Sequence, residues 1–374
     1  MKGHIRERSP GHWAIVIDVR DAETGKRKRK WHSFKGTKRE AQVECARLIA
    51  SVGQGSYVER SKTAVTDFVR SRIDQWEAAG GITARTSQRY HLLLKKQIAP
   101  HLGTKPLQKL TRLEIESWHT ILRKGGLAAR TIGHAHRLLS KALNDAESDG
   151  LVVKNVCKIQ RAPKVAEREI TIIRDVPAFL AKLPHDSRLY VLAIVALFTG
   201  MRLGEILALS EQRVDLDAGV IKVRETLEET TAHGIRSKET KTKAGRRNIT
   251  LPSIVIETMR EHRRELLEMR MRLGLGKLNP DDLLFSNVEG RPLRPSAVSI
   301  DWGELADRIG VPEVTFHALR HTHASQLIAS GIDIVTIGKR LGHAKPSVTL
   351  SIYAHMFTTD DSKCAAAINA ALKG

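Results

Sequence analysis

The sequence predicts a multidomain, mainly α-helical protein with small β-sheets. Its 374 residues exceed one ordinary domain, its apolar residues alternate near the start and follow a helical period from residue 61, and two loop-like segments interrupt the pattern. We expect a three-stranded sheet with one helix in residues 1–58, a four-helix unit in residues 61–160, and an α+β domain with a C-terminal tail helix in residues 165–374.

The chain is strongly basic. It contains 62 Lys and Arg against 41 Asp and Glu, which gives a formal net charge of +21. This excess is more than solubility requires and favours a polyanionic partner, nucleic acid rather than a membrane. Aromatic residues make up only 4%, which disfavours proteins that stack single-stranded bases. The longest apolar run, residues 189–198, is too short to cross a bilayer, so we expect no membrane partner.

The first forty residues concentrate the charge, with twelve Lys or Arg and five acidic residues. Residues 13–19 alternate as a strand, and a turn at residues 24–25 leads into a second strand. Thr37 precedes Glu40 by three positions, the spacing of a capping box, so a helix should begin there. Such a sheet could lay its strands in a DNA major groove with residues 26–30 near phosphates, or its basic hairpin could simply be solvated.

The next hundred residues repeat their apolar positions at helical spacing. Four helices are expected: Pro100 should end the second, and a capping box from Thr111 to Glu114 should open the third. Residues 53–56 should form a linker before this helical unit, and residues 160–164 a second linker after it. Basic side chains on these helices could line a duplex or lie in solvent.

A strongly apolar helix, residues 189–198, leads into the sequence TGMRLGE, residues 199–205. Arg202 follows a buried helix and has little solvent around it, so it should have an anionic partner, and Glu205 is the nearest candidate. A purely structural ion pair is the alternative. A β-hairpin should follow, with residues 219–223 as one strand and residues 240–251 as a turn flanked by strands.

Two lysines, Lys241 and Lys243, should lie at the tip of that hairpin. Either could sit in water, and either could reach a phosphate or a leaving oxygen. A later helix opens with the sequence FHALRHT and should run to Ser330 before Gly331. His317 and Arg320 are three positions apart, so they share a face and can address the same group.

Two further histidines, His321 and His323, raise the question of a metal site. No HExxH or CxxC pattern and no carboxylate in ligand register accompanies them, so we expect no metal and no cofactor. Further on, His343 precedes Tyr353 by ten positions; a lone tyrosine after a helix would usually serve packing. The three cysteines are far apart and no secretory start is visible, which favours the cytoplasm.

Together these segments resemble the tyrosine recombinase family of the phage-integrase type. The sequence TGMRLGE is similar to the first arginine box, HALRHTHAS to the H-x-x-R-H-T box, and LGHAKPSVTLSIYAH to the closing box with the tyrosine. Their order and spacing over about 150 residues make the resemblance specific. The basic sheet and the helical unit resemble the arm-binding domain and the SAM-like core-binding domain of such integrases, so the resemblance covers nearly the whole chain.

The resemblance implies a role for each matched residue. Tyr353 would be the nucleophile that forms a 3′-phosphotyrosyl link and frees a 5′-hydroxyl. Arg202 and Arg320 would bind the non-bridging oxygens of the phosphate. His317 would accept the proton of Tyr353, and His343 would donate a hydrogen bond to the phosphate.

Further roles follow from the same resemblance. Lys241 would be the general acid to the 5′-oxygen, with Lys243 as the alternative because the turn varies in length within the family. Glu205 resembles a buttress of the arginine box, and His321 a structural partner within the helix. Thr250 stands where the family usually has a proline, a departure at a strand end that should not affect the chemistry.

Physical chemistry independently favours these roles. Two guanidinium groups match the equatorial oxygens of a phosphodiester in transfer, so divalent ions are unnecessary. A phenol needs a base or a cationic environment to attack at neutral pH, and the histidine and arginines would supply both. The covalent intermediate retains the energy of the cleaved bond, so strands can be rejoined without ATP, as in type IB topoisomerases.

The resemblance also implies partners and a setting. We expect double-stranded DNA with core and arm attachment sites, a homotetramer on that DNA, a possible accessory DNA-bending or directionality factor, and a bacterial cytoplasm in which the protein is associated with the nucleoid. The tail at residues 365–372 could dock on a neighbouring protomer or on its own domain. The alternatives are a Xer-like resolvase of chromosome or plasmid dimers, a DNA-binding regulator that has lost catalysis, and a type IB topoisomerase without site specificity.

Overall fold

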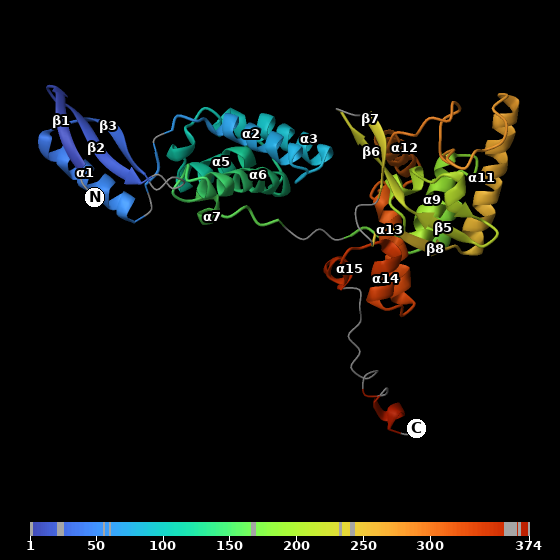
Figure 1. Ribbon diagram of the computed structural model, residues 1–374. Helices are drawn as coiled ribbons and strands as arrows, with labels where there is room; N and C mark the ends of the chain where they lie inside the picture. The colour runs from blue at the N-terminus through green and yellow to red at the C-terminus, as the bar shows by residue number, and fades with distance from the viewer. Residues whose placement is uncertain are drawn as a thin grey trace. The chain divides into compact units, whose positions relative to one another are not determined.

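The computed structural model describes residues 3–20, 26–54, 57–59, 61–165, 170–231, 234–239, 244–354, 365 and 368–372 (Figure 1). The chain divides into two compact units, residues 1–166 and residues 167–374. Among the described residues, four hydrophobic cores account for most of the buried side chains: one under the N-terminal sheet, one in the helical part of the first unit, and two in the second unit, the smaller of which contains Tyr353. The predicted mainly helical, multidomain fold with small sheets is confirmed.

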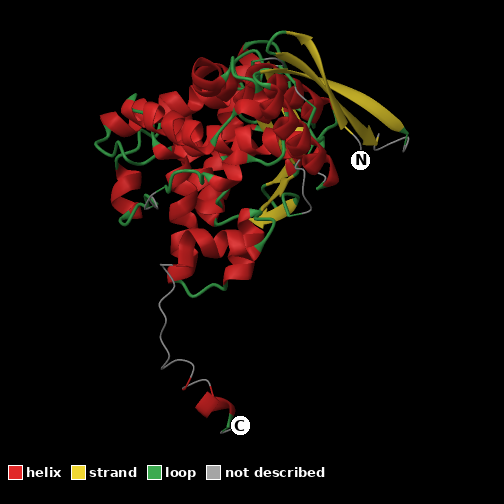
Figure 2. Ribbon diagram, turned by 90° about the vertical axis from the view of Figure 1, so that its left-hand side faces the viewer, coloured by secondary structure: helices red, strands yellow, loops and turns green. Residues whose placement is uncertain are grey.

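The first unit begins with an antiparallel three-stranded sheet, drawn as the long strands in Figure 2. Its strands are β1 (Gly3–Ser9), β2 (His12–Arg20) and β3 (Arg27–Lys35), with β2 in the centre. Helix α1 (Lys38–Gly53) follows, and its start shows both hydrogen bonds of the predicted capping box between Thr37 and Glu40. The sheet and its single helix therefore agree with the sequence prediction.

The two faces of this sheet differ in what covers them. Ile15 and Ile17 of β2 pack against Cys45 and Leu48 of α1. On the other face Val16 is also buried, because it is flanked by its cross-strand neighbours His4 and Trp31. We call that face the open face. It carries basic side chains from both edge strands and an exposed tryptophan: Arg6, Arg27, Arg29, Lys35 and Trp31.

The remainder of the first unit is helical, as predicted. Its elements are α2 (Val65–Ala78), α3 (Ala84–Leu93), the π-helix η1 (Leu94–Ile98), α4 (Ala99–Leu102), the short 3-10 turn η2 (Leu107–Lys109), α5 (Arg112–Lys124), α6 (Ala129–Ser148) and α7 (Val156–Ile159). The predicted capping box at the start of α5 is present.

The expectation that Pro100 ends the second of these helices is wrong. The helix changes to π geometry over η1, where the backbone N–H of Ala99 bonds to the carbonyl of Leu94, and continues as α4 to Leu102. Pro100 has no N–H to donate to the preceding turn, and the change to π geometry directly before it lets the helix continue past the proline.

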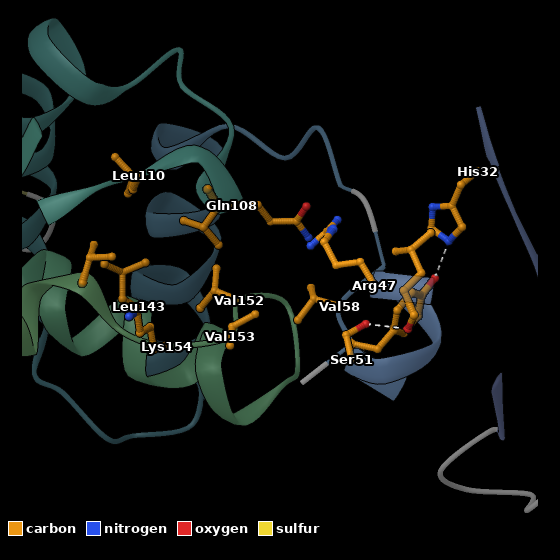
Figure 3. Close-up of a pocket in the computed structure, with 14 residues that line it drawn as sticks. His32, Arg47, Ser51, Val58, Gln108, Leu110, Leu143, Val152, Val153 and Lys154 are labelled. Carbon is orange, nitrogen blue, oxygen red and sulfur yellow. Dashed lines mark hydrogen bonds between the residues drawn. The ribbon is translucent and has the colours of Figure 1, made fainter. Parts of the chain in front are cut away.

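A cavity of about 420 Å³ lies in the first unit beside the segment that follows α1 (Figure 3). Apolar side chains such as Leu110, Leu143 and Val152 line it together with Arg47 and Lys154. None of the predicted catalytic residues that the structure describes lines this cavity. The predicted catalytic residues that the structure describes all belong to the second unit.

The second unit combines helices with a three-stranded sheet and a separate hairpin. Its helices are α8 (Val176–Ala181), α9 (Arg188–Thr199), α10 (Leu203–Leu207), the 3-10 turn η3 (Glu211–Arg213), α11 (Ser253–Arg272), α12 (Pro295–Arg308), α13 (Phe316–Ala329), α14 (Ile334–Leu341) and α15 (Pro346–Tyr353). Its strands are β4 (Val214–Asp215), β5 (Val220–Val223), β6 (Glu225–Thr230), β7 (Gly234–Glu239) and β8 (Arg247–Thr250). Helix α9 is almost wholly buried, as its composition predicts, and α13 packs against it.

The predicted hairpin in this unit is only partly correct. Strand β5 pairs with β8, Ile221 opposite Ile249, but the two strands are not consecutive. An additional hairpin, β6 and β7, lies between them in the sequence. It was missed because β6 reads ETLEET, which lacks the alternation of apolar and polar residues that marks a half-buried strand. Residues 240–243, which hold Lys241 and Lys243, lie outside the described residues.

Two further expectations concern the ends of the chain and the membrane. In the described part of the chain, no helix is long and apolar enough to span a bilayer. Of the expected tail helix, residues 365 and 368–372 are described, and all of them are exposed. Their proposed docking site stays a prediction.

Candidate active site in the second unit

The first arginine box forms a tight turn between two helices. Gly200 ends α9 in the left-handed region with φ +69°, and a Cβ added there would lie 2.6 Å from Cδ2 of His323, so a larger residue would not fit. Arg202 then occupies the N-cap of α10. Its Nη1 donates to Oε1 of Glu205 at 2.7 Å, and its backbone N–H donates to Oε2 at 3.0 Å. The expected partner of Arg202 is therefore in place, and the Arg202 side chain is still 42% exposed.

Glu205 is buried between two guanidinium groups. Besides Arg202, it binds Arg247 of β8, whose Nη2 donates to Oε2 at 2.8 Å. Burial raises the pKa of this carboxyl, but the hydrogen bond and charge of Arg247 and the charge of Arg202 outweigh it and hold the pKa at about 2. Glu205 is therefore ionised at neutral pH, and it anchors both arginines.

Arg320 lies deep in the site, with 3% of its surface exposed. Its guanidinium donates from Nη1 to the carbonyl of Gly200 at 2.5 Å and from Nη2 to the carbonyl of Leu341 at 2.7 Å. Nη2 also lies 3.0 Å from Nε2 of His343. Burial, together with the charge of Arg202, lowers the pKa of Arg320 to about 9. A group held in this way is fixed before any ligand arrives.

His343 connects this arginine to α15. It follows Gly342, which ends α14 with φ +71°, and its Nδ1 lies 2.7 Å from Oγ1 of the buried Thr349. Burial and the charges of Arg320 and Arg202 lower the pKa of His343 to about 4. Burial and the same two arginines also lower the pKa of His317. His343 therefore lies against Arg320, and His317 precedes Arg320 by three positions on α13.

Tyr353 ends α15 and is 1% exposed. Its hydroxyl lies 2.7 Å from Nδ1 of His321, and the His321 ring lies edge-on to the His317 ring with centroids 4.6 Å apart. Burial raises the pKa of Tyr353 to about 12, although Arg320 opposes the shift. Burial, together with His317 and Arg320, lowers the pKa of His321 to about 4. At neutral pH the hydroxyl is protonated and the imidazole of His321 is neutral, so the two groups share one hydrogen bond whose donor depends on the tautomer of His321.

The structure brings five of the six predicted site residues into one cluster: Arg202, His317, Arg320, His343 and Tyr353. The sixth, Lys241, lies outside the described residues, as does Lys243. His321 has a partner beyond its own helix, because it contacts Tyr353 rather than only its neighbours on α13. Among the described residues no group of three or more His, Cys, Asp or Glu could hold a metal ion.

Two residues at the site were missed by sequence reasoning. Thr349 carries no recognisable signal, because a threonine in a short helix is common. Arg247 did carry one: it shares the inward face of its strand with Ile249 and Leu251, and a basic residue in an inward register must have a buried partner.

These features define a class of protein, the tyrosine recombinases, which are enzymes that cleave and rejoin DNA. The phage integrase family matches residues 171–359, which is half of the chain, so the chain belongs to the phage integrase family. An Arm DNA-binding domain matches residues 5–52, and the N-terminal SAM-like domain of phage integrases matches residues 70–123.

Individual proteins agree with this assignment. A protein of Caldanaerobacter subterraneus subsp. tengcongensis named "Tyrosine recombinase XerC-like" is 24% identical, over 96% of both chains. An integrase of the Tn1549 transposon in complex with a circular intermediate DNA has a similar fold, with a TM-score of 0.69, 20% identity, and coverage of 83% of this chain and 99% of that one. A lambda integrase tetramer bound to a Holliday junction gives a TM-score of 0.57, 19% identity, and coverage of 95% and 94%.

Proposed function

We propose that this recombinase integrates a phage genome or another mobile element at specific DNA sites, and excises it, through a 3′-phosphotyrosyl intermediate on Tyr353. The observation that carries the proposal is the convergence of Arg202, Arg320 and Tyr353 on one cationic cluster. Arg320 donates to the carbonyl of Gly200, two residues before Arg202, and Tyr353 contacts His321, the neighbour of Arg320 on α13. The three residues come from three elements, α10, α13 and α15, that are far apart in the sequence. A phosphodiester is the substrate whose charge this cluster matches.

The two arginines would bind the scissile phosphate. Arg320 is fixed by the carbonyls of Gly200 and Leu341, so it is preorganised and pays little to bind. Arg202 is anchored by Glu205 on one side and exposed on the other, which leaves its remaining N–H groups within reach of DNA. To donate a third hydrogen bond to the same phosphate, His343 would have to carry a proton on Nε2, which accepts from Arg320 in the free chain while Nδ1 lies against Thr349.

The proton of Tyr353 has two candidate acceptors on one helix. His317 is the residue that the family resemblance assigns, and His321 is the residue that the hydroxyl contacts in the absence of DNA. Both imidazoles are neutral at pH 7, because burial and nearby arginines lower their pKa. Bound phosphate would bring negative charge to the cluster and raise both pKa values, so either ring becomes a better base when DNA is present.

Lys241 is proposed as the general acid that protonates the leaving 5′-oxygen, with Lys243 as the alternative. The segment that holds both lysines runs from the end of β7 to the start of β8. Strand β8, which follows these lysines in the sequence, begins with Arg247, and Arg247 binds Glu205 in the arginine cluster.

The open face of the N-terminal sheet is proposed to bind arm-type sites. Its central strand buries Val16 between the edge strands, which carry basic side chains such as Arg6 and Arg29 on this face. Trp31, 57% exposed on this face, offers an apolar contact of the kind that thymine methyl groups accept. A strand face of this size can enter a major groove.

We further propose that four protomers act on two duplexes in the bacterial cytoplasm, where the protein is associated with the nucleoid, and that an accessory DNA-bending or directionality factor can take part. The lambda integrase tetramer supports the assembly by similarity of fold. The similarity to a XerC-like recombinase is consistent with the alternative function of a dimer resolvase. The match to an Arm DNA-binding domain favours an integrase with separate arm sites.

The test is a recombination assay in EDTA with duplexes from both boundaries of the genomic segment that encodes the chain. An integrase yields recombinant products only when both sites are present. Relaxation of plasmid without either site would instead favour a topoisomerase, and binding without any cleavage would favour a regulator. Efficient resolution of plasmid dimers after removal of residues 1–58 would favour a resolvase.

A further inference from the structure

Arg247, the first residue of β8, is buried in the site and binds both Glu205 and the backbone of α14. Only 7% of its side chain is exposed. Nη2 and Nη1 donate to the two carboxylate oxygens of Glu205 at 2.8 and 3.3 Å, and Nε donates to the carbonyl of Arg340 at 2.6 Å. It thus binds Glu205 with the fork of its guanidinium and holds the end of α14 with its third nitrogen.

Glu205 is shared unequally between two arginines. Arg247 approaches it with two guanidinium nitrogens, whereas the Arg202 side chain reaches it with Nη1 alone. The backbone N–H of Arg202 takes a further place on Oε2. A carboxylate binds a guanidinium best through both oxygens in one plane. Arg247 therefore occupies the position in which Glu205 would otherwise bind Arg202 more fully.

We propose that Arg247 is a positioning residue for Arg202: by occupying Glu205, it keeps the Arg202 guanidinium turned toward the DNA phosphate. The inference rests on the proposed function, since it assumes that Arg202 binds the scissile phosphate. It also explains the charge of the site. Arg202 and Arg247 share the one carboxylate of Glu205, and Arg320 binds only backbone carbonyls and His343, so the cluster keeps a net positive charge that a phosphodiester can neutralise.

The same residue fixes the segment that carries His343. The Arg340 carbonyl accepts from Arg247, and the next carbonyl, that of Leu341, accepts from Arg320. Gly342 follows, and a Cβ there would lie 2.7 Å from Nη1 of Arg247. The glycine thus makes room for the guanidinium. Removing Arg247 would loosen Arg202 and the turn before His343 together.

The experiment measures single-turnover formation of the covalent protein–DNA product on a nicked core-site duplex, with the affinity for the same duplex measured separately. The full-length variant Arg247→Lys keeps the positive charge but loses the fork. We expect it to form the product about 100-fold more slowly, the loss typical of one misplaced transition-state donor, with affinity changed by less than about 3-fold. Arg246→Lys is the matched control, because Arg246 is an exposed neighbour paired with Glu239, and it should react at the wild-type rate.

A double-mutant cycle distinguishes positioning from a merely structural role. If Arg247 acts mainly through Arg202, then combining Arg202→Ala with Arg247→Lys slows the reaction by clearly less than the product of the two single losses, and what remains is the effect on the turn before His343. Independent, multiplying losses would overturn the proposal, and so would a wild-type rate for Arg247→Lys. Should Arg247→Lys unfold below the assay temperature, Arg247→Gln must meet the same criteria. If the wild-type chain forms no covalent product, the proposed function itself is refuted, and the role of Arg247 in positioning Arg202 for catalysis is refuted with it.

Discussion

The hydroxyl of Tyr353 lies 2.7 Å from Nδ1 of His321, a residue 32 positions earlier in the chain. Without DNA, the proposed nucleophile is thus buried and bonded to a neutral imidazole. To attack a phosphate it must either give up this hydrogen bond or pass its proton along it. The free chain therefore holds Tyr353 in a resting arrangement rather than an activated one.

This arrangement predicts an unusually high pKa for Tyr353. Burial raises it to about 12, although the charge of Arg320 opposes the shift. In a rapid pH jump to 11, the absorbance of phenolate should therefore be the same in the wild type and in Tyr353→Phe. In His321→Ala, Tyr353 should ionise more readily, because its partner and part of its cover are gone. Ionisation of Tyr353 near pH 10 in the wild type would contradict this account.

The environment of His323 predicts that the free energy of unfolding falls in acid. Its Nδ1–H donates to the Leu197 carbonyl, and its Nε2 accepts from Nε of Arg340, so the ring must be neutral. Burial, together with Arg340, lowers its pKa to about 3. Because this pKa lies below the ordinary 6.5, the stabilisation is complete above pH 6.5 and is lost as the pH falls toward 3.

The measurement is urea unfolding of the wild type and of His323→Gln at several pH values. In the variant, the free energy of unfolding should fall less steeply between pH 6.5 and 3, by up to about 1.4 kcal/mol per pH unit, the contribution of one proton. Equal slopes in the two proteins would show that His323 titrates normally.

Substitutions of Arg6 and Arg47 test which face of the N-terminal domain binds DNA. Arg6 lies on the open face opposite Ala14, whereas Arg47 is an exposed residue of α1, the helix that covers the other face. Arg6→Ala should make the salt dependence of arm-duplex binding shallower by about 0.9 in log Kd against log salt, one phosphate contact, and should leave core cleavage intact. Arg47→Ala should change neither quantity. Identical effects of the two substitutions would exclude the open face as the DNA-binding surface.

Much of the second unit was readable from the sequence because its signals are local. The buried helix before Gly200 is a continuous apolar run, and the pair His317 and Arg320 share a face by spacing alone. Each of the three boxes, moreover, ends at or begins from a helix terminus. The residues of each box that lie at a helix terminus can therefore be predicted from the few residues around them.

What the sequence did not reveal depends on partners that are distant in the chain. Arg247 binds Glu205 across 42 positions, so its basic run resembles any solvated hairpin until the strand register is considered. The hydrogen bond between His321 and Tyr353 likewise joins two boxes that were read separately. The hairpin β6 and β7 was missed because its strands are polar. The boundary near residues 58–61 and the role of Lys241 stay predictions.

The general acid can be identified by the leaving group. A 5′-bridging phosphorothiolate needs no proton to depart, so it should restore cleavage to the variant that lacks the acid. We expect rescue of Lys241→Ala and none of Arg320→Ala, because Arg320 is proposed to stabilise the phosphate rather than to supply a proton. The readout is the rate of covalent product formation on matched oxygen and sulfur duplexes. Rescue confined to Lys243→Ala would assign the role to that residue.

The most direct test of the central claim is the covalent bond itself. A duplex nicked beside a candidate crossover site is incubated with the full-length chain in EDTA, and the products are separated under denaturing conditions. The account predicts a protein–DNA band with the wild type, with a 3′-phosphate linked to Tyr353, and no band with Tyr353→Phe, which should still bind the duplex. A band of undiminished strength with Tyr353→Phe would contradict it.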